Sequence, residues 1–246
     1  MATVTSARAI HPDCATRVAT PPPIYAKLPQ APITASRVPE LTSLYHFDEA
    51  EHYGGNRAYP GNCGGKLIYD LLRYFQPASV FDPMTGSGTC RYVCDRLGIE
   101  CTSHDLKSGF DACNPASYAT DWRFDFVWLH PPYWRQKRYS DSPDDLSTTR
   151  TLGEFLARYR LLIENCAKVL SPQGKLAILM GDYTDRECGY VPLGYHTKQL
   201  AFTAELRQDC TDIVRFSHGT SSSRKVYRSS FIPNLHDVCT IFAKQN

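Results

Sequence analysis

Apolar and polar positions follow a regular pattern from residue 64 onward. Apolar residues at helical spacing predict helices over residues 66–75, 88–97, 152–170 and 197–207. Short apolar runs between them predict buried strands over residues 79–82, 99–104, 124–129, 175–180, 211–216 and 237–243. Because strands and helices alternate, we expect a mostly parallel, doubly wound α/β sheet. The last two strands have no predicted helix between them and are expected to form an antiparallel C-terminal hairpin.

The first 45 residues lack this pattern. They contain seven prolines, among them Pro21 to Pro23, together with many Ala, Thr and Ser residues. Such a composition cannot bury a core and favours extended or flexible chain, although it could also wrap over the surface of a domain. We therefore expect a Pro-rich, flexible segment over residues 1–45 and one α/β domain over residues 46–246.

Composition and charge limit the core size, the partners and the cellular location that we expect. With 42% hydrophobic residues among 246, the chain can bury a sizeable core. Its net charge of +2 provides no global attraction for nucleic acid, so any nucleic-acid surface must be local. The chain has no apolar run of membrane-spanning length and no signal-peptide pattern, which favours a cytoplasmic protein without membrane contact.

Ten cysteines are spread along the chain without a CxxC pair or a histidine at zinc-ligand spacing. Cys90 and Cys94 lie one helical turn apart, and the others are scattered. In a cytosolic chain, such cysteines are usually reduced and fill the core as small apolar residues. We therefore expect no metal site.

A glycine-rich loop connects the first predicted strand to the helix that follows it. It begins with Asp82 and continues as Pro-Met-Thr-Gly-Ser-Gly to Thr89. Glycines allow the backbone to approach a ligand closely, and the helix N-terminus offers free N–H groups. The phosphate-binding patterns GxGxxG and GxxxxGK[ST] are absent, and an acid at the start of the loop favours a cation such as an ammonium group. Asp105, 23 residues further on, stands where doubly wound folds hold a ribose diol, although a plain capped turn would also explain the loop.

A second short sequence, His130 to Trp134, follows the strand predicted over residues 124–129. Pro131 and Pro132 have no N–H to donate, so the strand must end there. His130, Tyr133 and Trp134 would then stand at the carboxyl end of the sheet, where ligands bind in open α/β folds. The alternative is that the motif only terminates the strand.

These two sequences together resemble a known family of enzymes. The loop from Asp82 to Thr89 resembles the DPFxGSGT motif of S-adenosylmethionine-dependent DNA methyltransferases that modify amino groups, and His130 to Tyr133 resembles their [D/N/S]PP[Y/F] motif. Residues 57–75 resemble the family element that packs over the methionine end. The resemblance covers residues 56–243 and implies a Rossmann-like methyltransferase fold with a seven-stranded sheet and S-adenosylmethionine as cofactor.

Residue by residue, the resemblance implies a cofactor site in which Asp105 binds the ribose and Asp111 accepts from the adenine amino group. Asp111 is equally well explained as a solvated acid or a cap. The full set of implied cofactor-binding residues is Asn62, Cys63, Asp82, Pro83, Gly86, Gly88, Thr89, Asp105 and Asp111.

The implied catalytic residues are His130, Pro131, Pro132 and Tyr133. The family uses the first side chain and the first prolyl carbonyl to accept hydrogen bonds from the base amine, while the tyrosine stacks on the flipped base. His130 departs from the family pattern, because a neutral histidine can accept one hydrogen bond and a protonated one none. The position of Trp134 directly after Tyr133 resembles the SPPYW variant of cytosine-N4 enzymes. This resemblance favours cytosine N4 slightly over adenine N6. Methylation of RNA and a catalytically idle nucleic-acid-binding relative stay open as alternatives.

Local polar segments are candidates for DNA contact. Basic residues, hydroxyls and an aromatic ring in close sequence suit phosphates and bases, although a solvated loop is the plainer reading. The candidate substrate-binding residues are Trp134, Arg135, Lys137, Arg224, Lys225 and Arg228. Without a separate recognition domain, the protein could read DNA through these loops, as a homodimer or with an accessory partner, in restriction-modification or another role.

Overall fold

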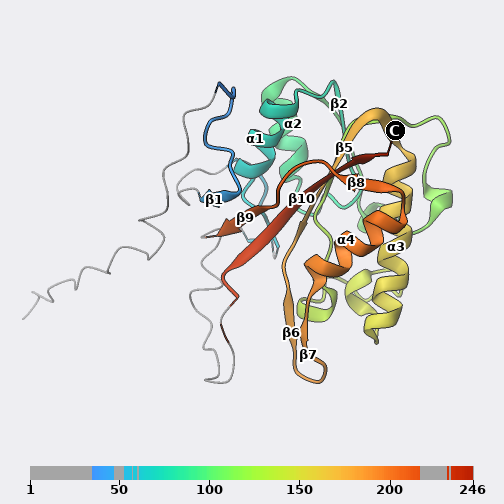
Figure 1. Cartoon of the computed structure of the whole chain (residues 1–246). Helices are drawn as coiled ribbons and strands as arrows, with labels where there is room; N and C mark the ends of the chain where they lie inside the picture. Colours follow the sequence, from blue (N-terminus) through green and yellow to red (C-terminus); the bar gives the residue numbers. More distant parts are fainter. Residues whose placement is uncertain are drawn as a thin grey trace, which may run out of the picture. The chain divides into compact units, whose positions relative to one another are not determined.

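The protein is described by a computed structural model at residues 35–46, 53–56, 58–59, 61–216, 232 and 234–245. Within these residues, one eight-stranded sheet has the order β1-β9-β10-β5-β4-β2-β3, and β8 pairs with β10 (Figure 1). The strands are β1 (Leu44–His46), β2 (Ser79–Asp82), β3 (Glu100–Ser103), β4 (Phe124–Leu129), β5 (Leu170–Met180), β8 (Leu206–Gln208), β9 (Ile213–Phe216) and β10 (His236–Lys244).

Strand direction follows the expected pattern. β3, β2, β4 and β5 pair in parallel, and β10 is antiparallel to β5, β8 and β9. The expected doubly wound, mostly parallel sheet with a C-terminal antiparallel hairpin, formed by β9 and β10, is therefore confirmed. The sheet has eight strands where the resemblance implies seven; β8 and the N-terminal β1, which pairs in parallel with β9, are the two that the hydrophobic pattern did not predict.

Four α-helices cover the two faces of the sheet: α1 (Lys66–Phe75), α2 (Thr89–Leu97), α3 (Leu152–Lys168) and α4 (Leu193–Thr203). α1 and α2 lie on one face, α3 and α4 on the other (Figure 1). Successive residues of β4 point to opposite faces, so Phe126 and Trp128 join the core under α1 and α2 while Val127 and Leu129 join the core under α3 and α4. None of the described helices is long and apolar enough to cross a membrane.

Several short elements depart from the pattern expected from the sequence. Helix α4 begins at Leu193 and not at residue 197, and it stops before Glu205, whose φ of 57° lies in the left-handed region. The chain then turns into β8, which the sequence pattern had assigned to the helix. The hairpin of β6 (Tyr183–Asp185) and β7 (Gly189–Val191) was also missed, because three-residue strands are too short to show a period of two.

The N-terminal boundary expected at residue 45 is too late in the chain. Val38 is fully buried, and Tyr45 is buried with its hydroxyl donating to Asp70 at 2.6 Å. Residues 44–46 form β1 at the edge of the sheet. Residues 35–45 therefore pack with the α/β domain, and the rest of the predicted flexible segment lies outside the described residues.

Candidate functional site

A cavity of about 410 Å³ lies where the loops after β2, β3 and β4 meet. This is the carboxyl edge of the parallel strands, where ligands bind in doubly wound sheets. Its volume falls in the range of sites for small molecules and cofactors. Five stretches of chain contribute to its wall: 59–63, 82–90, 105–113, 128–132 and 139–146. The glycine-rich loop and the strand end at His130 therefore face a common space.

The wall of the cavity is strongly acidic. It contains five aspartates against one lysine, Lys107, among the described lining residues. The five acids are Asp82, Asp105, Asp111, Asp144 and Asp145. Such a wall attracts a cation and repels the phosphates of a dinucleotide or a nucleoside triphosphate. The electrostatics thus agree with the absence of phosphate-binding motifs from the sequence.

Asp82 is the deepest of these acids, with only 2% of its surface exposed. Its Oδ1 accepts from the backbone N–H of Met84 at 3.1 Å. Burial nevertheless dominates and raises the pKa of Asp82 to about 8, because the charged form loses its hydration. Near neutral pH this carboxyl therefore holds a proton, which a bound cation would displace.

The glycine-rich loop is fastened to the neighbouring strand end by Asp105. The backbone N–H of Gly86 donates to Asp105 Oδ2 at 3.0 Å, and that of Lys107 donates to Oδ1 at 3.0 Å. Gly86 has φ of 51°, and a Cβ there would lie 3.1 Å from Cε1 of Tyr59. The position therefore needs glycine both for its backbone conformation and for the approach of the tyrosine.

A hydroxyl and amide cluster closes the loop from the other side. Asn62 Oδ1 accepts from the Thr89 hydroxyl at 2.7 Å and from the backbone N–H of Gly64 at 3.3 Å. The Ser87 and Thr89 hydroxyls are 2.9 Å apart. Asn62 lies 27 residues before Thr89 in the chain. The fold thus brings together two stretches that the family resemblance had assigned to the cofactor site.

The wall of the cavity also contains Phe110 and Asp111. Phe110 lines the cavity, and its ring stacks on His104 with 4.5 Å between ring centroids. Asp111 Oδ1 caps the turn by accepting from the backbone N–H of Cys113 at 2.9 Å, and it lies 3.7 Å from an Arg158 nitrogen. Asp111 is therefore a capping residue that also belongs to the cavity wall, and its contact with adenine stays a prediction.

The motif expected to be catalytic, residues 130–133, is divided between the cavity wall and the protein interior. His130 and Pro132 line the cavity, whereas Pro131 is buried and Tyr133 does not belong to the wall. His130 Nε2 and the Tyr133 hydroxyl are 3.1 Å apart. The tyrosine ring packs so closely on Gly181 that a Cβ there would lie 2.6 Å from its Cε2. The geometry therefore points the tyrosine hydroxyl to His130, while one edge of its ring packs on Gly181.

A buried ion pair lies behind the motif. Arg215 is 1% exposed; its Nη2 donates to Asp237 Oδ2 at 2.7 Å and its Nη1 to the backbone carbonyl of Cys63 at 2.9 Å. Burial, followed by the Asp237 carboxylate and a hydrogen bond to it, raises the pKa of Tyr133 well above its usual value. The hydroxyl therefore stays protonated, and it lies 3.1 Å from His130 Nε2.

Two of the expected substrate contacts are corrected by the structure. Trp134 is fully buried and its indole N–H donates to the Thr149 carbonyl at 3.2 Å, so it cannot extend a base-stacking platform. Its φ of 48° turns the ring from the end of β4 into the core. Arg135 forms two hydrogen bonds with Asp185, at 2.8 and 2.7 Å, and a further one of 2.6 Å with Glu187, so its charge is already neutralised.

The structure describes only one of the four remaining candidate substrate residues. Lys137 is exposed just beyond the motif. Arg224, Lys225 and Arg228 lie outside the described residues. Of the nine expected cofactor-binding residues, Gly88 alone is not part of the cavity wall; it precedes α2 as its N-terminal cap.

Three residues of the site were missed in the sequence. Tyr59 and Tyr139 line the cavity and stack on each other with 6.3 Å between centroids, although they are 80 positions apart in the chain. Arg158 of α3 donates to the Pro143 carbonyl at 2.6 Å and also to that of Asp144, which fixes the loop that contains Tyr139. No local motif marks these residues, because their roles depend on contacts between distant segments.

The comparisons with known proteins found similarity in structure only. No family model matches the chain, and no curated protein matches it in sequence. A candidate DNA modification methylase from Thermus thermophilus, complexed with S-adenosyl-L-methionine, is 18% identical with a TM-score of 0.39 over 55% of this chain and 54% of that one. This chain thus spans about half the length of that protein.

Two further solved structures cover more of the chain. A SAM-dependent methyltransferase from Archaeoglobus fulgidus has 15% identity and a TM-score of 0.47 over 73% of this chain and 94% of its own. The 1,6-didemethyltoxoflavin-N1-methyltransferase from Burkholderia thailandensis, with bound S-adenosylhomocysteine, has 15% identity and a TM-score of 0.44 over 74% of this chain and 78% of its own. At such scores the likeness carries no functional weight, so function must be argued from the site.

Proposed function

We propose that this protein is an S-adenosylmethionine-dependent methyltransferase that modifies the exocyclic amino group of a base in DNA, with cytosine N4 favoured over adenine N6. One observation carries the proposal. A single acidic cavity joins the glycine-rich loop after β2 to the His130-Pro-Pro-Tyr motif after β4. Cofactor and amine would therefore meet at the carboxyl edge of the sheet.

The residues of the wall fit S-adenosylmethionine group by group. Asp82 and the Asn62 cluster would hold the methionine end, Asp105 the ribose hydroxyls, and Phe110 with Asp111 the adenine. The cofactor carries ammonium and sulfonium charges, which the five aspartates of the wall would stabilise. When bound, it supplies a methyl group that its sulfonium already activates.

In this proposal His130 accepts a hydrogen bond from the amine of the base. The lone pair of a base amine is delocalised into the ring, and accepting its N–H groups localises that lone pair on nitrogen. The protonated Tyr133 hydroxyl lies 3.1 Å from His130 Nε2, and its oxygen can accept from His130 Nε2–H. In that tautomer Nδ1 is the acceptor nitrogen of the ring.

Tyr133 acts in this scheme through His130 and is a positioning residue. This replaces the stacking role expected from the sequence, since its ring packs on Gly181 and not along the cavity. An aromatic surface for the base is instead available at Tyr139, which lines the cavity and is held by Tyr59 and the Arg158-bound loop. A base that leaves the duplex could stack on this ring.

The proposal is tested by incubating the full chain with methyl-labelled S-adenosylmethionine and either duplex DNA or total RNA, followed by mass analysis of the nucleosides. We expect the label in N4-methyldeoxycytidine from DNA. Label on adenine N6 would keep the reaction and correct the base, whereas label found only in RNA would refute the DNA assignment. No methylated base on either substrate, with cofactor bound, would refute the catalytic proposal.

A further inference from the structure

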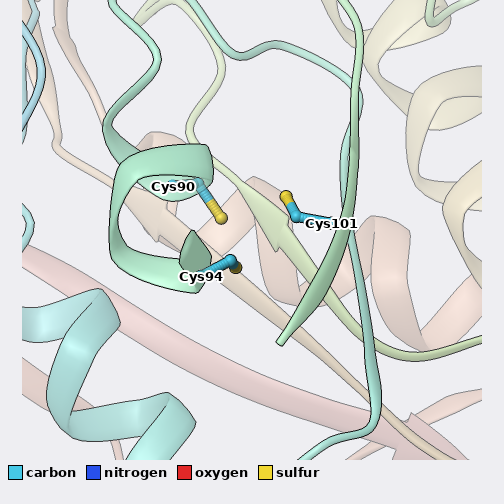
Figure 2. A group of neighbouring side chains, drawn as sticks. All are labelled: Cys90, Cys94 and Cys101. Atoms are coloured by element: carbon cyan, nitrogen blue, oxygen red, sulfur yellow. The ribbon is translucent and has the colours of Figure 1, made fainter. Parts of the chain in front are cut away.

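Three buried cysteines meet beside the cofactor cavity. Cys90 and Cys94 lie one turn apart on the inner side of α2, and Cys101 lies on β3, which α2 covers. Their sulfur atoms are all within 4.8 Å of one another, and the side chains converge on one point (Figure 2). The exposed fractions are 1%, 0% and 8%, so the group is closed to bulk solvent.

We propose that these three cysteines bind one Cu(I) ion in a three-coordinate, all-sulfur site. Thiolate ligands select soft metal ions, above all Cu(I), Zn(II) and iron–sulfur clusters. Three sulfurs arranged in a plane around a metal at about 2.3 Å stand about 4.0 Å apart. The observed cluster needs only small side-chain adjustments to reach this geometry, because all three sulfurs already lie within 4.8 Å.

The number of ligands separates Cu(I) from the other soft metals. Zn(II) and iron–sulfur sites are built from four protein ligands or keep an open position for a water or substrate. Among the described residues, no fourth cysteine, histidine or carboxylate joins the group. A buried group of three sulfurs therefore fits Cu(I), which can be stable with three ligands.

A metal ion binds the thiolate forms of these cysteines, and one hydroxyl lies beside the cluster. The Ser103 hydroxyl lies 3.3 Å from the Cys101 sulfur and can donate to it. Each thiol that becomes a ligand releases its proton to solvent, so Cu(I) affinity rises with pH.

A metal ion in the cluster would also affect the neighbouring cavity, because the cysteines are close in sequence to residues of its wall. Cys90 follows Thr89 of the glycine-rich loop directly and also lines the cavity, while Cys101 lies four residues before Asp105. The cavity side of Cys90 offers an entry path for the ion. A bound ion would tie α2 to β3 and so fix the two segments that hold the loop. This departs from the sequence-based expectation of no metal.

The test uses the reduced full chain under anaerobic conditions, with Cu(I) supplied in competition with a chromophoric chelator. The starting protein has Cys14, Cys188 and Cys210 replaced by serine, since Cys188 and Cys210 are exposed and would bind copper unspecifically. We expect one Cu(I) per chain and an affinity at least about 100-fold weaker in Cys101→Ala, since even outer-shell changes cost about 10- to 100-fold. Cys239→Ala, a buried cysteine outside the cluster, should keep the affinity.

X-ray absorption on the copper-loaded starting protein provides a readout that needs no cluster variant to fold. Three sulfurs at about 2.3 Å and no nitrogen or oxygen support the site. A mixed shell, an unchanged affinity in Cys101→Ala, or Zn(II) bound at least as tightly as Cu(I) would overturn it. Because the measurement involves neither S-adenosylmethionine nor DNA, it is independent of the proposed methyl transfer.

Discussion

Replacing Asp82 by asparagine should change how the stability of the protein depends on pH. Asp82 is buried in the cavity wall, and burial raises its pKa from 3.8 to about 8. The folded state therefore holds a proton on this carboxyl between about pH 4 and pH 8, while the unfolded chain has lost it. This stabilising contribution is complete below pH 4 and is lost as the pH rises through 8.

The magnitude follows from the size of the shift. A difference between 3.8 and about 8 amounts to at most about 6 kcal/mol, because one pKa unit is worth about 1.4 kcal/mol. Asparagine keeps the shape of the side chain and cannot ionise. The free energy of unfolding of Asp82→Asn, minus that of the wild type, should thus rise by about 1.4 kcal/mol per pH unit between pH 5 and pH 7.

Urea denaturation of both proteins at pH 5, 6 and 7 measures this difference. The exposed Asp121 is the matched control, since Asp121→Asn alters a carboxyl that is solvated in both states. The difference for Asp121→Asn should stay flat across the range. If the Asp82→Asn difference is equally flat, Asp82 is ionised in the folded protein, and the desolvation argument for the cavity is wrong.

Three other substitutions probe the remaining parts of the site. Tyr133→Phe keeps the ring but removes the hydroxyl 3.1 Å from His130, so kcat should fall by about 100-fold with an unchanged Kd for cofactor; an unchanged kcat would exclude the hydroxyl from the reaction. Arg158→Met releases the loop carbonyls and the contact with Asp111, which should weaken cofactor binding by about tenfold in calorimetry, and unaltered binding would separate this arginine from the site. Trp134→Ala opens a hole in the core and should cost about 3–5 kcal/mol of unfolding free energy in urea; a loss below about 1 kcal/mol would show that the ring is not packed.

The elements that the sequence predicted well are those that face the core. Helix α1 and strands β2 and β4 have the expected bounds, because an unbroken apolar face leaves only one way to bury them. The glycine-rich loop and His130 could be identified from the sequence for a related reason, since each belongs to a motif of consecutive residues. Contacts between distant segments have no such local signature.

Trp134 and Tyr139 illustrate this limit from opposite directions. Trp134 stands next to the catalytic motif in sequence, yet a left-handed backbone turns it into the core. Tyr139 stands in a polar stretch, yet the fold brings it against Tyr59 on the cavity wall. Proximity in sequence assigned Trp134 to the site, whereas the fold puts Tyr139 on the cavity wall, since the orientation of a ring depends on the backbone beyond the motif.

Calorimetric titration of the full chain with S-adenosylmethionine, NAD and ATP tests most directly whether the acidic cavity is the cofactor site. We expect S-adenosylmethionine to bind at one site per chain, with loss of binding in Asp105→Ala, which removes both the proposed ribose ligand and the support of Gly86. NAD and ATP should not bind, because the acidic wall repels phosphates. Tighter binding of NAD or ATP than of S-adenosylmethionine would contradict the account.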